Sequence, residues 1–220
     1  MFSGVKISEV VFRERLSKRK FCAIFLVDVR GKTCVMKVHH GRGPRLPYEN
    51  KLRQQNHHIC ESTAYQRLAE SGIAGRVTPQ FYGVIENIDP ALCEPHLQPF
   101  AEDEYPPNAI LLEYIPDMEE LHWTNYTEKR MRNFISGIKE IHDVLIEHSD
   151  LYPRNMMVVK GDPERAIWLD FDRAQTFAGP ITEREESWIE TERRIAEEIS
   201  ILMRDDHAAG KMDKTAIFYY

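Results

Sequence analysis

The sequence lacks long apolar segments and has few cysteines. No run of 18 apolar residues occurs, so no membrane-spanning helix and no membrane partner are expected. The first twenty residues contain no apolar core of the kind found in secretory signals. The cysteines form no CxxC pair and no metal-ligand spacing: Cys22, Cys34, Cys60 and Cys93. We therefore expect a cytoplasmic protein with reduced thiols and no resident metal.

Positive charge is also scarce, since 29 Lys and Arg face 35 Asp and Glu for a net charge of −6. This net charge argues against nucleic-acid binding, but its distribution is uneven. Residues 1–60 hold 13 basic and 4 acidic residues, a net of +9, so the remaining 160 residues carry −15. Such asymmetry is typical of a polyanion partner, yet a scattered, solvated basic surface explains it equally well.

The hydrophobic pattern predicts an α+β chain of two lobes. A hairpin is expected from segments 21–29 and 33–38, which are rich in β-branched and aromatic residues. Helices are expected where apolar residues recur at steps of three and four. The expected helices span 51–71, 127–147 and 183–204, and further strands are expected at 80–85, 109–115, 156–159 and 166–169. The order predicts one domain over 1–220, with an N-lobe of about 1–115 and a C-lobe of about 119–220.

Four motifs, in order along the chain, resemble those of the protein-kinase-like fold. Lys37 in VMK matches the strand lysine, and Glu61 in ESTAYQRL is the best candidate for its ion-pair partner. Asp150 and Asn155 in HSDLYPRN match the catalytic-loop pair, and Asp170 in WLDFD matches the metal-binding aspartate of DFG. The resemblance covers about residues 20–175. It implies a small β-rich N-lobe and a shortened helical C-lobe.

Three departures from the kinase pattern weaken the expectation of kinase activity. Before Lys37 the glycines are Gly4 and Gly31 alone, so no glycine-rich loop is present to bind phosphates. The glycine of DFG is replaced by Asp172, and the 48 residues that follow contain no APE-like segment. These features predict weak or absent Mg-ATP binding and no platform for a peptide substrate.

The string DLYPRN resembles the D-x-x-P-R-N motif of the fungal arginine-containing cyclodipeptide synthases. That resemblance implies an enzyme that joins arginine from arginyl-tRNA to a residue carried by a second aminoacyl-tRNA and releases a cyclic dipeptide. It also implies that no ATP cofactor is needed, because the aminoacyl esters are already activated. The motif assigns the catalytic site to Asp150, Pro153, Arg154 and Asn155.

The chemistry of these side chains suggests a role for each. Asp150 is the natural general base for an attacking amine, and Asn155 could hydrogen-bond it or the substrate carbonyl. The planar guanidinium of Arg154 suits a terminal tRNA phosphate, and Pro153 fixes the shape of the loop. Ser149 is an alternative acyl acceptor, although the sequence shows no base for it.

Substrate contacts are expected on both sides of this motif. Glu113, Asp170 or Asp172 could bind the arginyl guanidinium, and Lys37 with Glu61 would complete the substrate site. Basic residues of the N-terminal third would contact tRNA: Arg13, Arg15, Lys18, Arg19, Lys20, Arg42, Arg45, Lys51 and Arg53.

We therefore expect a tRNA-dependent cyclodipeptide synthase, with two alternatives. The first is a short atypical kinase, in which Lys37 would contact phosphate while Asn155 and Asp170 hold Mg²⁺. The second is a pseudokinase that binds a partner through the hinge and the final helix. The second amino acid of the product and the oligomeric state are not predicted.

Overall fold

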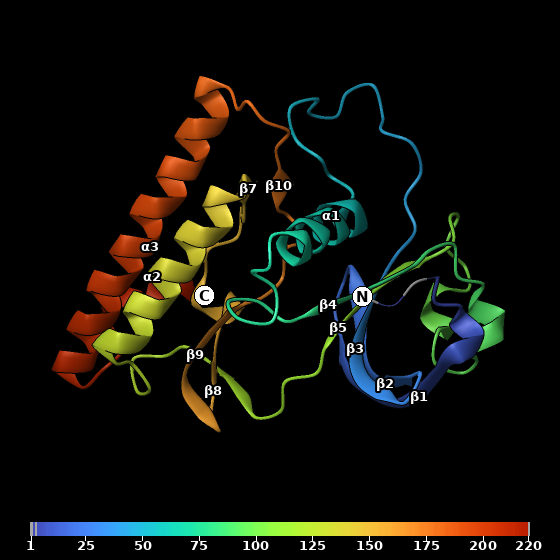
Figure 1. Cartoon of the computed structure of the whole chain (residues 1–220), viewed down its shortest axis with the longest axis horizontal. Helices are drawn as coiled ribbons and strands as arrows, with labels where there is room; N and C mark the ends of the chain where they lie inside the picture. Colours follow the sequence, from blue (N-terminus) through green and yellow to red (C-terminus); the bar gives the residue numbers. More distant parts are fainter. Residues whose placement is uncertain (1, 3, 220) are drawn as a thin grey trace.

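The computed structural model describes Phe2 and residues 4–219, which form two lobes joined near residues 114–117 (Figure 1). The N-lobe contains η1 (Ile7–Glu9), β1 (Val10–Lys18), β2 (Cys22–Val29), β3 (Lys32–His39), α1 (His57–Glu70), β4 (Phe81–Ile85), η2 (Pro90–Cys93), η3 (Gln98–Phe100) and β5 (Asn108–Glu113). The C-lobe contains β6 (Met118–Glu120), α2 (Glu128–Asp143), β7 (Ile146–Glu147), η4 (Pro153–Asn155), β8 (Met156–Val159), β9 (Asp162–Trp168), β10 (Gln175–Thr176), α3 (Glu183–Ala209) and η5 (Lys214–Phe218).

The N-lobe is built on an antiparallel sheet with strand order β1-β2-β3-β5-β4. Successive residues of β5 point to opposite faces of the sheet, as strand geometry requires. Leu111 joins the core formed with η2 and η3, whereas Ile110 and Leu112 pack with Tyr65 of α1. The sheet is therefore covered on both faces, and α1 lies on the face toward the C-lobe (Figure 1).

The first helix is shorter than the sequence predicts. It begins at His57 rather than near residue 51, because the Asn56 side chain accepts a hydrogen bond from the backbone nitrogen of Ile59. Residues 51–56 belong instead to the loop that follows β3. This start leaves His57 and Glu61 on the turns of α1 that lie nearest the catalytic residues.

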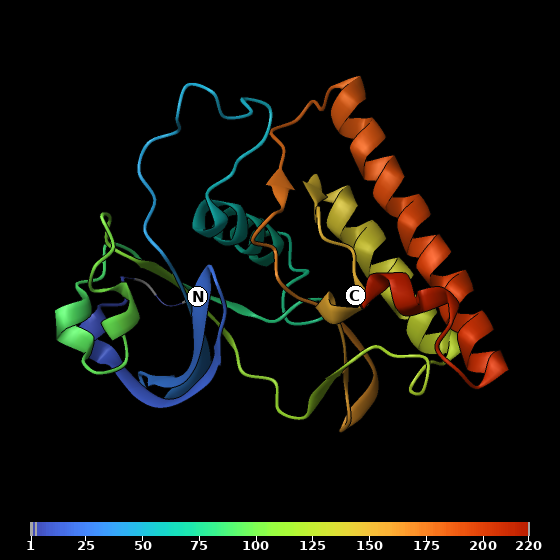
Figure 2. The ribbon, with the colours of Figure 1, turned by 180° about the vertical axis from the view of Figure 1, so that it is seen from behind.

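The C-lobe is organised by α2 and α3, which pack against each other. Helix α2 ends at Asp143, before the predicted residue 147, and the chain turns through Leu145 (φ 61°) into β7. Helix α3 starts in a capping box of Thr182 and Glu185, and it continues past the predicted residue 204 to a left-handed Gly210. The η5 segment then returns to lie beside η4 (Figure 2).

One long strand was not predicted. β1 pairs antiparallel with β2 along nearly its whole length, although Arg13, Glu14 and Arg15 break its apolar pattern. These charges are tolerated because β1 is an edge strand with exposed side chains, a common protection against unwanted strand pairing. The architecture confirms the predicted α+β, protein-kinase-like two-lobe fold. Among the described residues, no helix combines the length and apolar character needed to cross a membrane.

Candidate active site

A cleft of about 260 Å³ lies between the two lobes. Its walls are mainly apolar above and below, and charged side chains stand at one end. Leu16, Ile24 and Val35 come from the N-lobe sheet, while Met118 and Leu169 come from the C-lobe. A flat, apolar slot with a few polar groups is typical of a small-molecule site.

Four of the predicted site residues meet at the charged end of the cleft. The Lys37 Nζ lies 2.8 Å from Glu61 Oε2 and 2.5 Å from Asp170 Oδ1, and it is 3.9 Å from Asp172 Oδ2. Lys37 and Glu61 are almost completely buried. The predicted Lys37–Glu61 pair is thus present, and it connects β3 and α1 to the segment after β9.

The shared burial of these charges changes their proton affinities. Burial would lower the pKa of Lys37, but the three carboxylates raise it well above its ordinary value. Burial opposes ionisation of Asp170, yet Lys37 beside it lowers the pKa of that carboxyl to about 2. Burial raises the pKa of Asp172 despite the attraction of Lys37. Asp170 is therefore the carboxylate of this group whose ionised form is favoured.

A buried histidine extends this cluster. His39 Nε2 lies 2.8 Å from Glu61 Oε2. Burial, and then repulsion by Lys37, lowers the pKa of His39 to about 3. The neutral imidazole therefore donates its hydrogen to Glu61 and holds that carboxylate toward Lys37 without adding charge.

The catalytic loop brings together Asp150, Arg154 and Asn155. The Asp150 carboxylate accepts hydrogen bonds from Arg154 Nη2 at 2.8 and 2.9 Å and from Asn155 Nδ2 at 2.8 Å. Pro153 begins the η4 turn that carries Arg154 back toward Asp150. The Asn155 Nδ2 also donates to the Asp150 carbonyl, which leaves its Oδ1 as the atom able to ligate a cation.

Two supports of this loop were not predicted from the sequence. Glu192 of α3 accepts hydrogen bonds from the backbone nitrogens of His148 and Ser149, at 2.8 and 2.6 Å. The His148 ring lies 4.5 Å from the ring of Phe171 and bonds the Leu169 carbonyl. Ser149 and Asp170 both have left-handed backbone angles, φ 62° and 65°, so the loop and the Asp170 turn need this support. The Ser149 hydroxyl accepts a hydrogen bond from Arg53 Nη1 at 3.0 Å.

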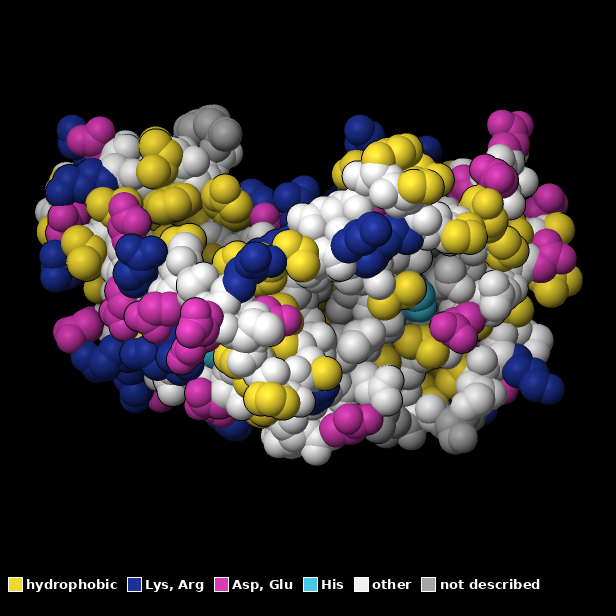
Figure 3. Space-filling view, turned by 90° about the horizontal axis from the view of Figure 1, so that it is seen from above, with side chains coloured by type: hydrophobic (Ala, Val, Ile, Leu, Met, Phe, Trp, Pro, Cys, Tyr) yellow, Lys and Arg dark blue, Asp and Glu magenta, His cyan; other side chains and the backbone are white. Residues whose placement is uncertain are grey.

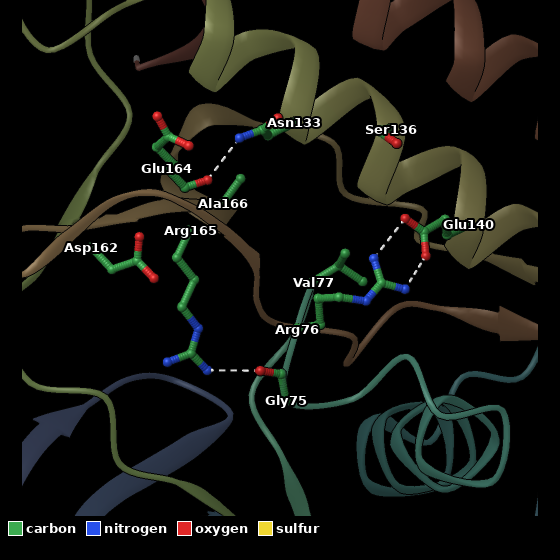
Figure 4. A pocket seen from close by; sticks show the side chains of 10 residues that line it. All are labelled: Gly75, Arg76, Val77, Asn133, Ser136, Glu140, Asp162, Glu164, Arg165 and Ala166. Atoms are coloured by element: carbon green, nitrogen blue, oxygen red, sulfur yellow. Dashed lines mark hydrogen bonds and ion pairs between the residues drawn. The ribbon is translucent and has the colours of Figure 1, made fainter.

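Glu113, a predicted substrate-binding residue, is already bonded within the chain. Its carboxylate accepts hydrogen bonds from Arg165 at 3.0 Å and from the Gln80 backbone nitrogen at 2.9 Å. Arg165 also donates to the Gly75 carbonyl and lines a second recess of about 620 Å³ (Figure 4). Arg76 in that recess is paired with Glu140 of α2, so this ion pair also joins two parts of the protein.

Basic and acidic side chains are interspersed on the face shown in Figure 3. Several of the basic residues expected to bind tRNA are paired within the chain: Arg13 with Asp28, Arg42 with Glu49, Arg53 with Glu147, and Arg45 with the carbonyls of Lys51 and Arg53. Arg15, Lys18 and Lys20 are exposed. Arg19 reaches into the cleft, where its Nη1 lies 3.2 Å from Asp170 Oδ2.

The donor atoms at the charged end suit a divalent cation bound together with phosphate. Within residues 2 and 4–219, no group of three or more His, Cys, Asp or Glu is arranged to hold a metal by itself. Mg²⁺ usually takes one or two protein ligands and completes its shell with phosphate oxygens and water. Asp170 and Asn155 provide such a pair on the floor of the cleft.

Comparison with protein families finds a match to the lipopolysaccharide kinase (Kdo/WaaP) family over residues 111–210. The matched segment runs from within β5 to the residue after α3, and it includes Asp150, Asn155 and Asp170. No curated protein matches the chain. The similarity is therefore to a kinase family.

This match corrects the prediction of a cyclodipeptide synthase. Its kinase character also makes the predicted aminoacyltransferase activity and the aminoacyl-tRNA and arginyl-tRNA partners wrong. The DLYPRN string misled because Asp150 and Asn155 are spaced for a kinase-like loop, while Pro153 and Arg154 lie in the η4 turn of that loop. The six residues of DLYPRN therefore predict the conformation of the loop, but they do not identify the reaction.

Proposed function

We propose that the protein is an ATP-dependent phosphotransferase that acts on a hydroxyl of a non-peptide acceptor. One observation carries the proposal: Lys37, Glu61 and Asp170 are assembled at the end of an apolar cleft that Asn155 also lines, in the loop of Asp150. Phosphoryl transfer needs a cation-binding carboxylate, a cationic contact for phosphate and a carboxylate near the acceptor. The similarity to a kinase family supports the same assignment.

Different parts of the cleft suit different parts of a nucleotide. Its apolar walls suit an adenine ring, and Lys37 at the charged end suits a phosphate. Asp170 and Asn155 Oδ1 would hold Mg²⁺, which neutralises phosphate charge when it is bound. Mg-ATP therefore replaces the earlier expectation that no cofactor is used.

Asp150 is the proposed acceptor of the hydroxyl proton. Both of its carboxylate oxygens are engaged by Arg154, whose guanidinium also lies 4.2 Å from the Tyr152 ring. Asn155 holds the carboxylate from the other side, so Asp150 keeps its place when Arg154 moves aside for the acceptor. Only the short segment 173–182 separates Asp172 from α3, which leaves little chain for a peptide-binding platform. By analogy with the matched lipopolysaccharide kinases, we infer a saccharide acceptor.

We further propose that the chain is one domain, with the N-lobe over about 1–115 and the C-lobe over about 119–220. The cytoplasm, where ATP is supplied, remains the proposed location.

The test combines calorimetric titration of the purified protein by Mg-ATP with two readouts from γ-labelled ATP: labelled phosphate released to water and label transferred to an added saccharide. We expect binding and slow turnover by the wild type, faster turnover with a suitable saccharide, and unchanged binding by Asp150→Asn. The variant should lose about 10²–10⁴-fold in rate, the usual effect of removing a general base. If the wild type binds no nucleotide, the proposal is wrong. Binding without any turnover or transfer would instead favour the pseudokinase.

A further inference from the structure

The turn between β1 and β2 covers the charged end of the cleft without glycine. It consists of Arg19, Lys20 and Phe21, and the Arg19 backbone nitrogen donates to the Cys22 carbonyl at 2.9 Å. Where this turn is rich in glycine, backbone N–H groups approach phosphate closely because no side chain intervenes. Here three bulky side chains prevent such an approach.

Arg19 already contacts the residue proposed to bind the cation. Its Nη1 lies 3.2 Å from Asp170 Oδ2, while Lys37 occupies the other oxygen, Oδ1, at 2.5 Å. Both oxygens of Asp170 therefore have cationic partners from the chain. A divalent cation that binds Oδ2 would displace the Arg19 guanidinium. More than half of the Arg19 side chain is exposed, so it has room to move.

The turn is held over this end of the cleft by an aromatic contact. The Phe21 ring stacks on the His57 ring with 5.0 Å between centroids, and His57 Nδ1 hydrogen-bonds the Asp172 carbonyl at 3.1 Å. Lys20 Nζ lies 5.1 Å from the Phe21 ring. The turn is thus held on α1 by the contact of Phe21 with His57, which is itself bonded to Asp172, while Arg19 extends from the turn into the cleft.

The excess of carboxylates around Lys37 means that additional cations are needed when a polyphosphate binds. Glu61, Asp170 and Asp172 present three carboxylates to the one ammonium of Lys37. A nucleotide triphosphate adds several negative charges, and a single Mg²⁺ does not balance them. The guanidinium of Arg19 can neutralise part of the remaining negative charge, because its planar donors bind phosphate in a bidentate manner.

We propose that Arg19 replaces the glycine-rich loop as a side-chain clamp for the nucleotide phosphates, exchanging Asp170 for a phosphate oxygen when Mg²⁺ takes its place at Asp170. The inference rests on the proposed function, and it identifies the group that recognises the phosphates.

The experiment measures binding of Mg-ATP and of adenosine by calorimetry to the full chain, with Arg19→Ala and Arg15→Ala as matched variants. Arg15 lies on β1, just before the turn that holds Arg19, and carries the same charge, but it does not line the cleft. Arg19→Ala should weaken Mg-ATP binding about ten- to a hundredfold, as expected for loss of a charge-assisted contact, and leave adenosine binding unchanged. Arg15→Ala should match the wild type for both ligands.

A second measurement follows Mn²⁺ alone by its effect on water proton relaxation. Arg19→Ala should bind Mn²⁺ more tightly than the wild type, because Asp170 loses a competing cation. Equal Mg-ATP affinity of Arg19→Ala and the wild type would refute the proposed phosphate contact of Arg19, but it would not refute the proposed phosphotransferase function. An equal loss of adenosine binding would show that Arg19 only shapes the cleft, which also refutes that contact. A wild type that binds no nucleotide would overturn both proposals.

Discussion

The charge cluster of the cleft depends on individual residues that occupy unusual environments. Lys37 has three carboxylates within 4 Å and is almost fully buried, so its own charge is needed to offset theirs. Removing one member of a buried ion pair generally costs more than the pair contributes, because an uncompensated charge remains. The neutral His39 beside Glu61 avoids adding a second buried cation to this cluster.

His39 should therefore make the protein less stable in acid. Its folded pKa of about 3 lies below the value near 6.5 of an unfolded histidine. Between these values the unfolded chain binds a proton that the native protein does not, so the stability present above pH 6.5 is lost as the pH falls. The slope attributable to this residue approaches about 1.4 kcal/mol per pH unit.

Urea unfolding between pH 4 and pH 7.5 measures this effect. His39→Gln keeps a donor for Glu61 but cannot titrate, so its stability should fall less steeply than that of the wild type. His122→Gln replaces a half-buried histidine that lies outside the Lys37 cluster; it serves as the control and should retain the wild-type slope. Identical slopes for all three proteins would contradict the assignment of His39.

At the scale of elements, helix α3 supports the loop of Asp150 through hydrogen bonds. Glu192 lies in the middle of α3, is buried, and accepts the backbone hydrogens of His148 and Ser149. Ser149 has a left-handed backbone conformation that is costly for a non-glycine residue. The two hydrogen bonds from this strained turn to α3 help to keep Asp150 in its orientation.

We expect Glu192→Ala to destabilise the protein by roughly 2–4 kcal/mol, because two buried N–H groups lose their acceptor. If turnover is present, its rate should fall while Mg-ATP affinity changes little, since Glu192 does not line the cleft. Chemical unfolding and calorimetry measure the two effects separately. Glu192→Gln retains an acceptor oxygen and should recover part of the lost stability, whereas a fully stable Glu192→Ala would refute the role.

The sequence predicted the elements whose signals are local. The β2–β3 hairpin follows from its β-branched and aromatic residues, and the helices α2 and α3 follow from apolar periodicity, although α3 continues beyond its predicted end at residue 204. β1 was missed because edge exposure tolerates its charged residues. Glu192 was missed because its partners lie 43 and 44 residues away, so no spacing within α3 reveals them.

Only part of the candidate site was predicted, because some of its contacts join residues that are distant in the sequence. Lys37, Glu61, Asp150, Asn155 and Asp170 follow from motif order, and the structure brings all five to the cleft region. The reaction could not be predicted from the motif, because the loop conformation that DLYPRN specifies is compatible with more than one reaction. The position of Arg19 at Asp170 could not be read from the sequence, since it depends on how the β1–β2 turn docks on α1.

For the molecule as a whole, two arginines connect the N-lobe to the C-lobe. Arg165 of β9 binds Glu113 of β5 and the Gly75 carbonyl (Figure 4). Arg53, in the loop before α1, binds Glu147 and Ser149 and lies 4.0 Å from the Trp188 ring. These contacts limit how far the lobes separate, and hence how widely the cleft opens.

Arg165→Ala should loosen the lobes without unfolding either one. We expect a loss of about 1 kcal/mol in unfolding free energy, because this pair is partly solvent-exposed. Hydrogen exchange in β5 should become faster, with little change in α2. Lys129→Ala removes an exposed ion pair within the C-lobe and is the control. Unchanged exchange in β5 would mean that the lobes are held by other contacts.

The return of the C-terminal segment has a practical consequence for handling the protein. Phe218 contacts Tyr152 of the catalytic loop, and the Tyr219 hydroxyl donates to the Leu121 carbonyl at 2.7 Å (Figure 2). An affinity tag or fluorescent reporter fused after this segment would begin beside the loop that carries Asp150. The Phe2 end instead pairs with Tyr82 of β4, on the N-lobe sheet. Fusions and surface immobilisation should therefore use the N-terminal end, leaving the approach to the catalytic loop open.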